Sequence, residues 1–152
     1  DIYCNTCKDY FDQLAHTHSR GSNCTICHKT NYSISACIWL ENIMITEEIE
    51  IQYALSREGE YIPLPNINKN LKVDGYHNCE KHACCGTKEN PCRWNNYIFE
   101  FHGGYWHGDP KIYDMNDINK NSKKKFGTLF FKTCIREYLF RSNGYKYKCK
   151  WE

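Results

Sequence analysis

The stretch of sequence that decides the fold is residues 97–110, which read YIFEFHGGYWHGDP. Aromatic and β-branched side chains dominate its first six residues and predict a strand over 97–102 that ends at a pair of glycines. Because side chains alternate across a strand, Glu100 and His102 lie on the same face. Core packing does not require two histidines, a tryptophan and several glycines so close together. We therefore expect a functional site here, with His102 and His107 bracketing it beyond the strand end.

The elements on either side of this strand follow an α-β-β-β-α-β order, which predicts an α/β fold. Apolar residues at helical spacing predict helices over 33–44 and 122–141, with Ser33 and Ser122 as their N-caps. The apolar face of the second helix is expected to contain Phe126, Leu129, Phe130, Ile135, Tyr138 and Leu139. Alternation predicts three further strands, which cover 49–53, 71–76 and 145–151. The last of them has one aromatic face and one lysine face.

Cysteines are unusually frequent, and their total of eleven is odd. Secreted disulfide scaffolds usually carry an even number in a shorter chain, so we predict a reducing, intracellular compartment such as the cytoplasm or nucleus. Two Cys-x2-Cys pairs near the N-terminus are a strong zinc signal, because four thiolates bind Zn²⁺ tightly and fold segments too short for their own core. We predict a zinc-binding module over residues 1–32 whose ligands are Cys4, Cys7, Cys24 and Cys27.

A second group of cysteines lies in residues 77–95, ahead of the central strand. Their density favours a second zinc site, but an adjacent pair and irregular spacing match no standard template, so this site stays open. Its candidate ligands are Cys79, Cys84, Cys85 and Cys92. We interpret the remaining Cys37, Cys134 and Cys149 as buried apolar residues.

Length and composition limit the architecture. With 152 residues, 41% of them hydrophobic, the chain supports one packed domain, which we place at 33–152. No apolar run approaches the roughly 18 residues of a membrane helix, so we expect no membrane association. The net charge is only +2, yet residues 111–152 are rich in Lys and Arg with interleaved aromatics, which suits nucleic acid. A solvated lysine face is the alternative interpretation.

Two carboxylates suit a divalent cation. Asp74 is expected near the end of the second strand, and Glu100 lies on the third. Carboxylate oxygens are typical ligands of Mg²⁺, which keeps several waters and takes further ligands from a phosphate. His102 or His107 would then move a proton or steady the leaving oxygen during phosphodiester hydrolysis. Taken alone, a carboxylate on each of two adjacent strands is equally compatible with surface or structural groups.

The sequence resembles the very-short-patch-repair (Vsr-like) endonucleases and their phage and large-virus relatives over residues 33–152. The matching motifs are Val73-Asp74-Gly75-Tyr76, residues 99–108 (FEFHGGYWHG), and the closing segment from Gly144-Tyr145 to Trp151-Glu152. Those enzymes belong to the PD-(D/E)xK nuclease superfamily, so the resemblance implies a restriction-endonuclease-like αβββαβ core with a mixed sheet. It also implies Asp74 as the family aspartate and His102 to His107 as the His-Gly-x-x-Trp-His block. Some relatives carry an N-terminal cysteine module, whose pattern His18, Gly21 and Cys24 fit.

Three departures from the family pattern bear on activity. His102 stands where the superfamily has a lysine, and Ala36 and Cys37 stand where many relatives have a helix glutamate. Glu41 is a candidate substitute for that glutamate. The cysteine-rich stretch at 77–95 is an insertion.

These features favour a Mg²⁺-dependent DNA endonuclease of the nicking or repair type, of viral or phage origin if the resemblance holds. Asp74 and Glu100 would hold the metal, and His102 and His107 would assist hydrolysis. Residues expected to contact phosphates are Lys123, Lys124, Lys125, Lys132 and Arg136, and Tyr105 or Trp106 is a candidate wedge into a base step. The alternatives are an inactive DNA-binding or structural protein with a nuclease fold, and a zinc-stabilised protein-interaction module. The DNA target, the number of strands cut and the oligomeric state stay open.

Overall fold

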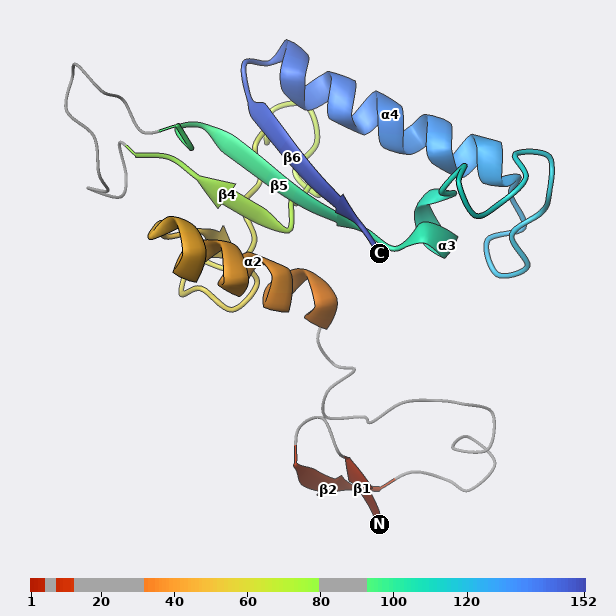
Figure 1. The fold of residues 1–152 in the computed structure, drawn as a ribbon, viewed down its shortest axis with the longest axis horizontal. Coiled ribbons are helices and arrows are strands. Elements are labelled where there is room, and N and C mark those ends of the chain that lie inside the picture. The colour runs from red at the N-terminus through yellow and green to blue at the C-terminus, as the bar shows by residue number, and fades with distance from the viewer. Residues whose placement is uncertain (5–7, 13–31, 80–92) are drawn as a thin grey trace. The chain divides into compact units, whose positions relative to one another are not determined.

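The computed structural model describes residues 1–4, 8–12, 32–79 and 93–152, and the chain divides into two units, Asp1–Ser33 and Ile34–Glu152. In the smaller unit, β1 (Ile2–Cys4) pairs antiparallel with β2 (Asp9–Phe11) (Figure 1). The rings of Tyr3 and Tyr10 meet across this pair, with centroids 5.1 Å apart. The side chain of Cys4 and the whole of Cys7, Cys24 and Cys27 lie outside the described residues.

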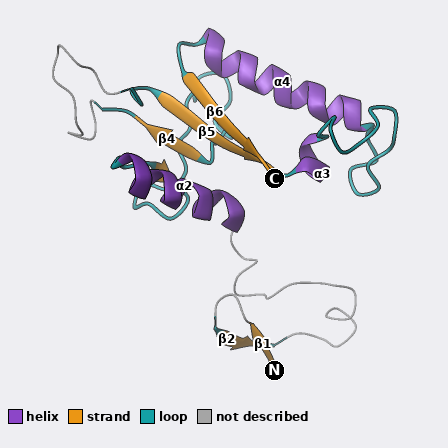
Figure 2. Ribbon diagram, in the orientation of Figure 1, coloured by secondary structure: helices purple, strands orange, loops and turns teal. Residues whose placement is uncertain are grey.

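The larger unit is built on a four-stranded mixed sheet, which confirms the predicted α/β class. Its strands are β3 (Gln52–Tyr53), β4 (Gly75–His77), β5 (Tyr97–His102) and β6 (Lys146–Trp151), in that spatial order. The first three run antiparallel to their neighbours, whereas β5 and β6 are parallel. The helices are α2 (Ile34–Glu47), α3 (Gly104–His107) and α4 (Phe126–Ser142), as Figure 2 shows.

The two long helices cover opposite faces of this sheet (Figure 1). Alternation along β5 sends Phe99 into a core cluster with Leu40 of α2, and Ile98 into a second cluster with Phe140 of α4. Burying each of these side chains contributes about 2 kcal/mol to folding. Glu100 has the same parity as Ile98, so its side chain lies on the α4 face of the sheet.

The second strand begins later than the sequence predicts. The sequence indicates 71–76, but β4 starts at Gly75, because the N–H of Val73 donates to the carbonyl of Tyr61 and stays outside the ladder. Asp74 therefore lies just before its strand, not near the strand's end. The first strand is likewise reduced from 49–53 to the two residues of β3.

Helix α4 also begins later than predicted, at Phe126 instead of Ser122. Lys123 has a φ of 58°, a left-handed conformation that no helix interior tolerates, and the N-cap is Lys125, which makes no side-chain cap. The first-turn N–H groups of Phe126 and Gly127 donate instead to loop carbonyls, those of Asp117 and Met115. Ser122 is thus part of the preceding loop and not a cap.

The apolar face of α4 differs from the prediction at two positions. Ile135 is 50% exposed and Tyr138 is 73% exposed, whereas Thr133 and Phe140 are buried. Since Thr133 and Phe140 define the buried side, Cys134 is turned about 100° away from it and is exposed, so its predicted burial is wrong. Cys37 is buried as predicted, and burial raises the pKa of its thiol; Cys149 is half-buried.

Neither α2 nor any other helix in the described ranges has the length and apolarity needed to cross a membrane.

Candidate active site

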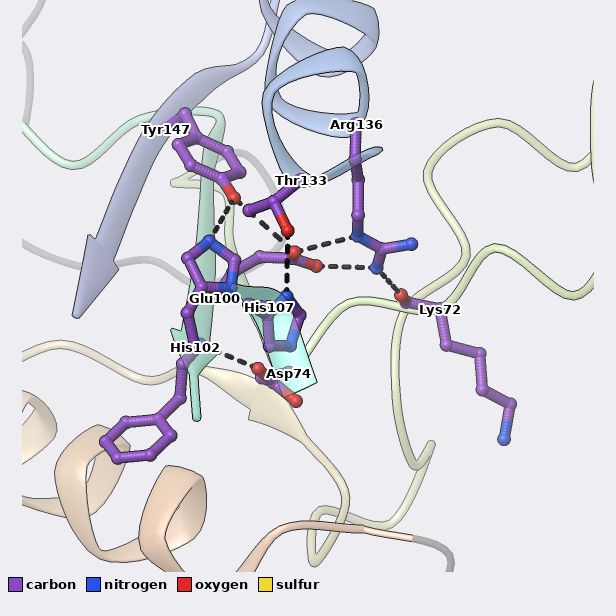
Figure 3. Close-up of polar contacts among 9 residues, drawn as sticks. Lys72, Asp74, Glu100, His102, His107, Thr133, Arg136 and Tyr147 are labelled. Atoms are coloured by element: carbon purple, nitrogen blue, oxygen red, sulfur yellow. Dashed lines mark hydrogen bonds and ion pairs between the residues drawn. The ribbon is translucent and has the colours of Figure 1, made fainter. Parts of the chain in front are cut away.

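Side chains from four elements and one loop converge on the α4 side of the sheet, near the end of β5 (Figure 3). The contributing elements are β5, β6, α3, α4 and the turn before β4. The residues are Asp74, Glu100, His102, His107, Thr133, Arg136 and Tyr147. The structure therefore brings together Asp74, Glu100, His102 and His107, the four catalytic residues that the sequence predicts.

Asp74 lies opposite Glu100 across the sheet. The β4–β5 ladder pairs Gly75 with Phe99, and one further step in this register sets Asp74 against Glu100. The N–H of Phe101 donates to Asp74 Oδ2 over 2.7 Å, while Oδ1 makes no hydrogen bond within the described residues. Burial raises the pKa of the Asp74 carboxyl, although the Phe101 hydrogen bond opposes this shift. Asp74 thus presents one oxygen for a further ligand.

Glu100 forms a buried ion pair with Arg136. The Arg136 guanidinium donates from Nη2 to Oε1 over 2.6 Å and from Nε to Oε2 over 2.7 Å, and it also donates to the carbonyl of Lys72. Burial raises the pKa of Glu100 against the opposing charge of Arg136. The side chain of Glu100 is 4% exposed, and both of its oxygens are occupied. The sequence predicts a phosphate contact for Arg136, whereas in this structure its guanidinium is bound to Glu100.

Histidine 102 is held as a neutral ring by Tyr147. His102 Nε2 lies 3.1 Å from the Tyr147 hydroxyl, which in turn donates to Glu100 Oε2 over 3.4 Å. A carboxylate only accepts, so both bonds form at once when Nε2 carries the proton and Nδ1 carries the lone pair. Nδ1 is buried and has no hydrogen-bond partner among the described residues. Burial, together with the charges of His107 and Arg136, lowers the pKa of His102 to about 3.

His107 is oriented in the same way by Thr133 of α4. The Thr133 hydroxyl donates to the carbonyl of Leu129 over 3.2 Å, so His107 Nδ1, 3.0 Å away, donates to the hydroxyl oxygen. Its Nε2 therefore carries the lone pair, and burial lowers the pKa of the ring. The rings of His102 and His107 lie 4.5 Å apart between centroids. Two neutral imidazoles thus present lone-pair nitrogens within one pocket.

A glycine permits this approach of α3 to α4. Gly108 ends α3 with a φ of 71°, and a Cβ built there would lie 2.3 Å from the carbonyl oxygen of Phe126. Any side chain at Gly108 would push α3 away from α4 and separate His107 from Thr133.

Acidification should destabilise the protein through His102. Its pKa is about 3 when folded and about 6.5 when unfolded, so between these values only the unfolded chain binds the proton. Stability is therefore lost as the pH falls below about 6.5, and we expect the loss between about pH 7.5 and pH 5 to be about 2 kcal/mol. Urea unfolding of wild type and His102→Gln at both pH values measures this difference. Equal pH dependence of the two proteins would show that His102 is not held neutral.

The residues fit a Mg²⁺ ion only in part. Asp74 Oδ1 is an available carboxylate oxygen, and Mg²⁺ needs as little as one protein carboxylate beside waters and substrate phosphates. Glu100 offers no oxygen while Arg136 holds it. Within the described ranges, no group of three or more His, Cys, Asp or Glu side chains is arranged to hold a metal ion.

One candidate zinc ligand of the insert, Cys79, is described, whereas Cys84, Cys85 and Cys92 lie outside the described residues. Cys79 Sγ lies 3.4 Å from Nε2 of the buried His77, whose Nδ1 is 2.5 Å from the carbonyl of Glu50. A carbonyl only accepts, so His77 Nδ1 donates and Nε2 faces the thiol. Sequence reasoning missed His77, although a histidine two residues before a cysteine was a visible signal.

The predicted phosphate-contacting lysines Lys123, Lys124, Lys125 and Lys132 are all exposed. Lys124 lowers the pKa of its neighbour Lys132, which reflects the local concentration of positive charge. Sequence reasoning also missed Tyr147 and Thr133. The alternation of the last strand had indicated that Tyr147 faces inward, but Thr133 had no signal in a helix described by its apolar residues.

Comparison with protein-family models, with curated proteins and with solved structures finds no match to this chain.

Proposed function

We propose that this protein is a metal-dependent DNA endonuclease of the nicking or repair type. The observation that supports this proposal best is the convergence of Asp74, Glu100, His102 and His107 on one face at the end of β5. Two carboxylates beside two neutral imidazoles supply both the charge and the proton acceptors that phosphodiester hydrolysis requires.

Each residue has a distinct part in the proposed reaction. His107 Nε2, fixed as a lone pair by Thr133, accepts a proton from the attacking water, and the low pKa keeps the ring neutral. Asp74 would hold Mg²⁺ through Oδ1, and Glu100 would join it once Arg136 transfers to a phosphate. When bound, the ion polarises the phosphate and lowers the pKa of a bound water.

A second candidate is a DNA-binding protein that keeps the fold without cleaving. The bidentate hold of Arg136 on Glu100 favours it, because this ion pair closes one of the two carboxylates to a cation. The histidine at position 102, where the resembling superfamily has a lysine, favours it too.

Nicking of supercoiled and mismatch-containing DNA with Mg²⁺, Mn²⁺ or EDTA tests the proposal. We expect cleavage with either divalent cation and none with EDTA. Tight DNA binding without cleavage under all conditions would overturn the nuclease and favour the second candidate.

Salt dependence should reveal the lysines that contact the phosphate backbone. We expect the triple variant Lys123→Gln, Lys124→Gln, Lys125→Gln to lower the slope of log affinity against log salt by up to about 3, about one for each lost contact. Fluorescence anisotropy with a short duplex at several salt concentrations measures the slope. The variant Lys69→Gln, an exposed lysine of the loop before β4, is the control and should leave the slope unchanged.

We further propose one structural Zn²⁺ at Cys4, Cys7, Cys24 and Cys27, with a second at the 77–95 insert left open. The support is the Cys-x2-Cys spacing and, for the insert, the pairing of His77 with Cys79. Metal analysis of the purified chain should find at least one zinc, and Cys24→Ser should lose it. Cys134→Ser, an exposed cysteine of α4, is the matched control. A zinc content that Cys24→Ser leaves unchanged would contradict this assignment.

A further inference from the structure

An aromatic pocket lies beside the candidate active site, in the loop between α3 and α4 and the elements that flank it. Its cavity has a volume of about 470 Å³, within the range of small-molecule sites. The lining residues are Tyr105, Tyr113, Asp117, Ile118, Lys120 and Phe126. None of them belongs to the group of side chains around Glu100.

Three rings form one wall of this pocket. Tyr113 stacks on Phe126 with centroids 4.2 Å apart and planes 12° from parallel, and Tyr105 meets both rings edge-on. The hydroxyl of Tyr105 donates to Asn121 Oδ1 over 3.1 Å, which fixes its ring. Aromatic surfaces of this kind stack on nucleobases without regard to sequence.

The loop that carries the pocket is held in shape by a fully buried asparagine. Asn119 donates from Nδ2 to the carbonyl of Tyr105 over 2.8 Å, and its Oδ1 accepts from the N–H groups of Asn121 and Ser122. The ends of the loop are tied to the first turn of α4 by the bond from the Phe126 N–H to the Asp117 carbonyl. A pocket already formed before binding loses little entropy when a ligand enters it.

Charge and position favour a nucleotide as the occupant. Residues 109–132 contain six lysines and three acidic residues, and Lys120 lines the pocket itself. Phe126 precedes Thr133, the partner of His107, by seven residues, which is about 10 Å along α4. This separation equals about three stacked base steps along a DNA strand.

We infer that this pocket receives one unpaired nucleobase of the DNA substrate, a few nucleotides from the scissile phosphate. The base stacks on Tyr113, Lys120 meets the adjacent phosphate, and the carboxylate of Asp117 accepts from an exocyclic amino group. Bases with an amino group, such as cytosine, should therefore bind better than thymine. The inference rests on the proposed function for its substrate, and it adds where that substrate is unstacked.

Binding of bulged duplexes without added divalent cation tests the inference apart from cleavage. We compare, by fluorescence anisotropy, one duplex with a single bulged cytosine, one with a bulged thymine and one with an abasic bulge. Wild type should bind the cytosine bulge about tenfold more tightly than the abasic bulge. Tyr113→Leu should reduce this ratio to about one while leaving the affinity for the abasic duplex unchanged. Tyr138→Leu, an exposed tyrosine of α4 outside the pocket, should keep the ratio.

Asp117→Asn provides a second readout that does not alter the rings. It should remove the preference for cytosine over thymine, whether or not Tyr113→Leu folds normally. A wild-type ratio near one, or a preference for cytosine that Asp117→Asn retains, would overturn the inference. Base preference without cleavage under any condition would overturn the nuclease alone, and cleavage without base preference would overturn the pocket alone.

Discussion

We expect Asp74→Asn to reduce DNA cleavage on the order of a thousandfold while DNA binding stays at the wild-type level. Asp74 is the one carboxylate of the site with an oxygen available to a cation, because Arg136 occupies both oxygens of Glu100. Asparagine keeps the shape of the side chain and its carbonyl oxygen still accepts from the N–H of Phe101. The change therefore removes charge without removing the hydrogen bond.

Initial rates of nicking with Mg²⁺, measured beside DNA affinity, separate chemistry from binding. The matched control is Asp114→Asn, since Asp114 is exposed and its Oδ1 likewise accepts a backbone N–H, that of Asn116, over 2.8 Å. The control should cleave at the wild-type rate. Cleavage by Asp74→Asn at an undiminished rate would remove Asp74 from the proposed mechanism.

Arg136→Met should destabilise the folded protein by about 3 kcal/mol, because it leaves the buried carboxylate of Glu100 without its partner. The value lies at the lower end for buried ion pairs, since the Arg136 side chain is 28% exposed. Replacing both partners, as Glu100→Leu with Arg136→Met, should restore much of the loss, since no charge is then left buried and unpaired.

Urea unfolding of the single and double variants gives both free energies. Arg141→Met is the matched control, because Arg141 pairs with Glu137 on the exposed side of α4 at a similar distance of 2.7 Å. It should cost less than about 1 kcal/mol. Equal losses from Arg136→Met and Arg141→Met would mean that the Glu100–Arg136 pair is open to solvent in solution.

Much of the larger unit was predictable because its signals are local. The strand at 97–102 and the last strand follow from residue types and alternation within a few positions, and both lie within one residue of the prediction. The start of α4 was not predictable in this way. Its first N–H groups are satisfied by carbonyls of Met115 and Asp117, so a serine in the loop was mistaken for the cap.

By itself, the sequence determined the α/β class, the order of the main elements and the shared face of Glu100 and His102. Tertiary structure alone decided what these side chains do to one another. Arg136 meets Glu100 across 36 positions, and Tyr147 meets His102 across 45, so no local pattern specifies either contact. Those contacts set which carboxylate is available and where each imidazole carries its lone pair. The physical reason is that proton positions and ion pairs depend on burial and on neighbours brought together only by folding.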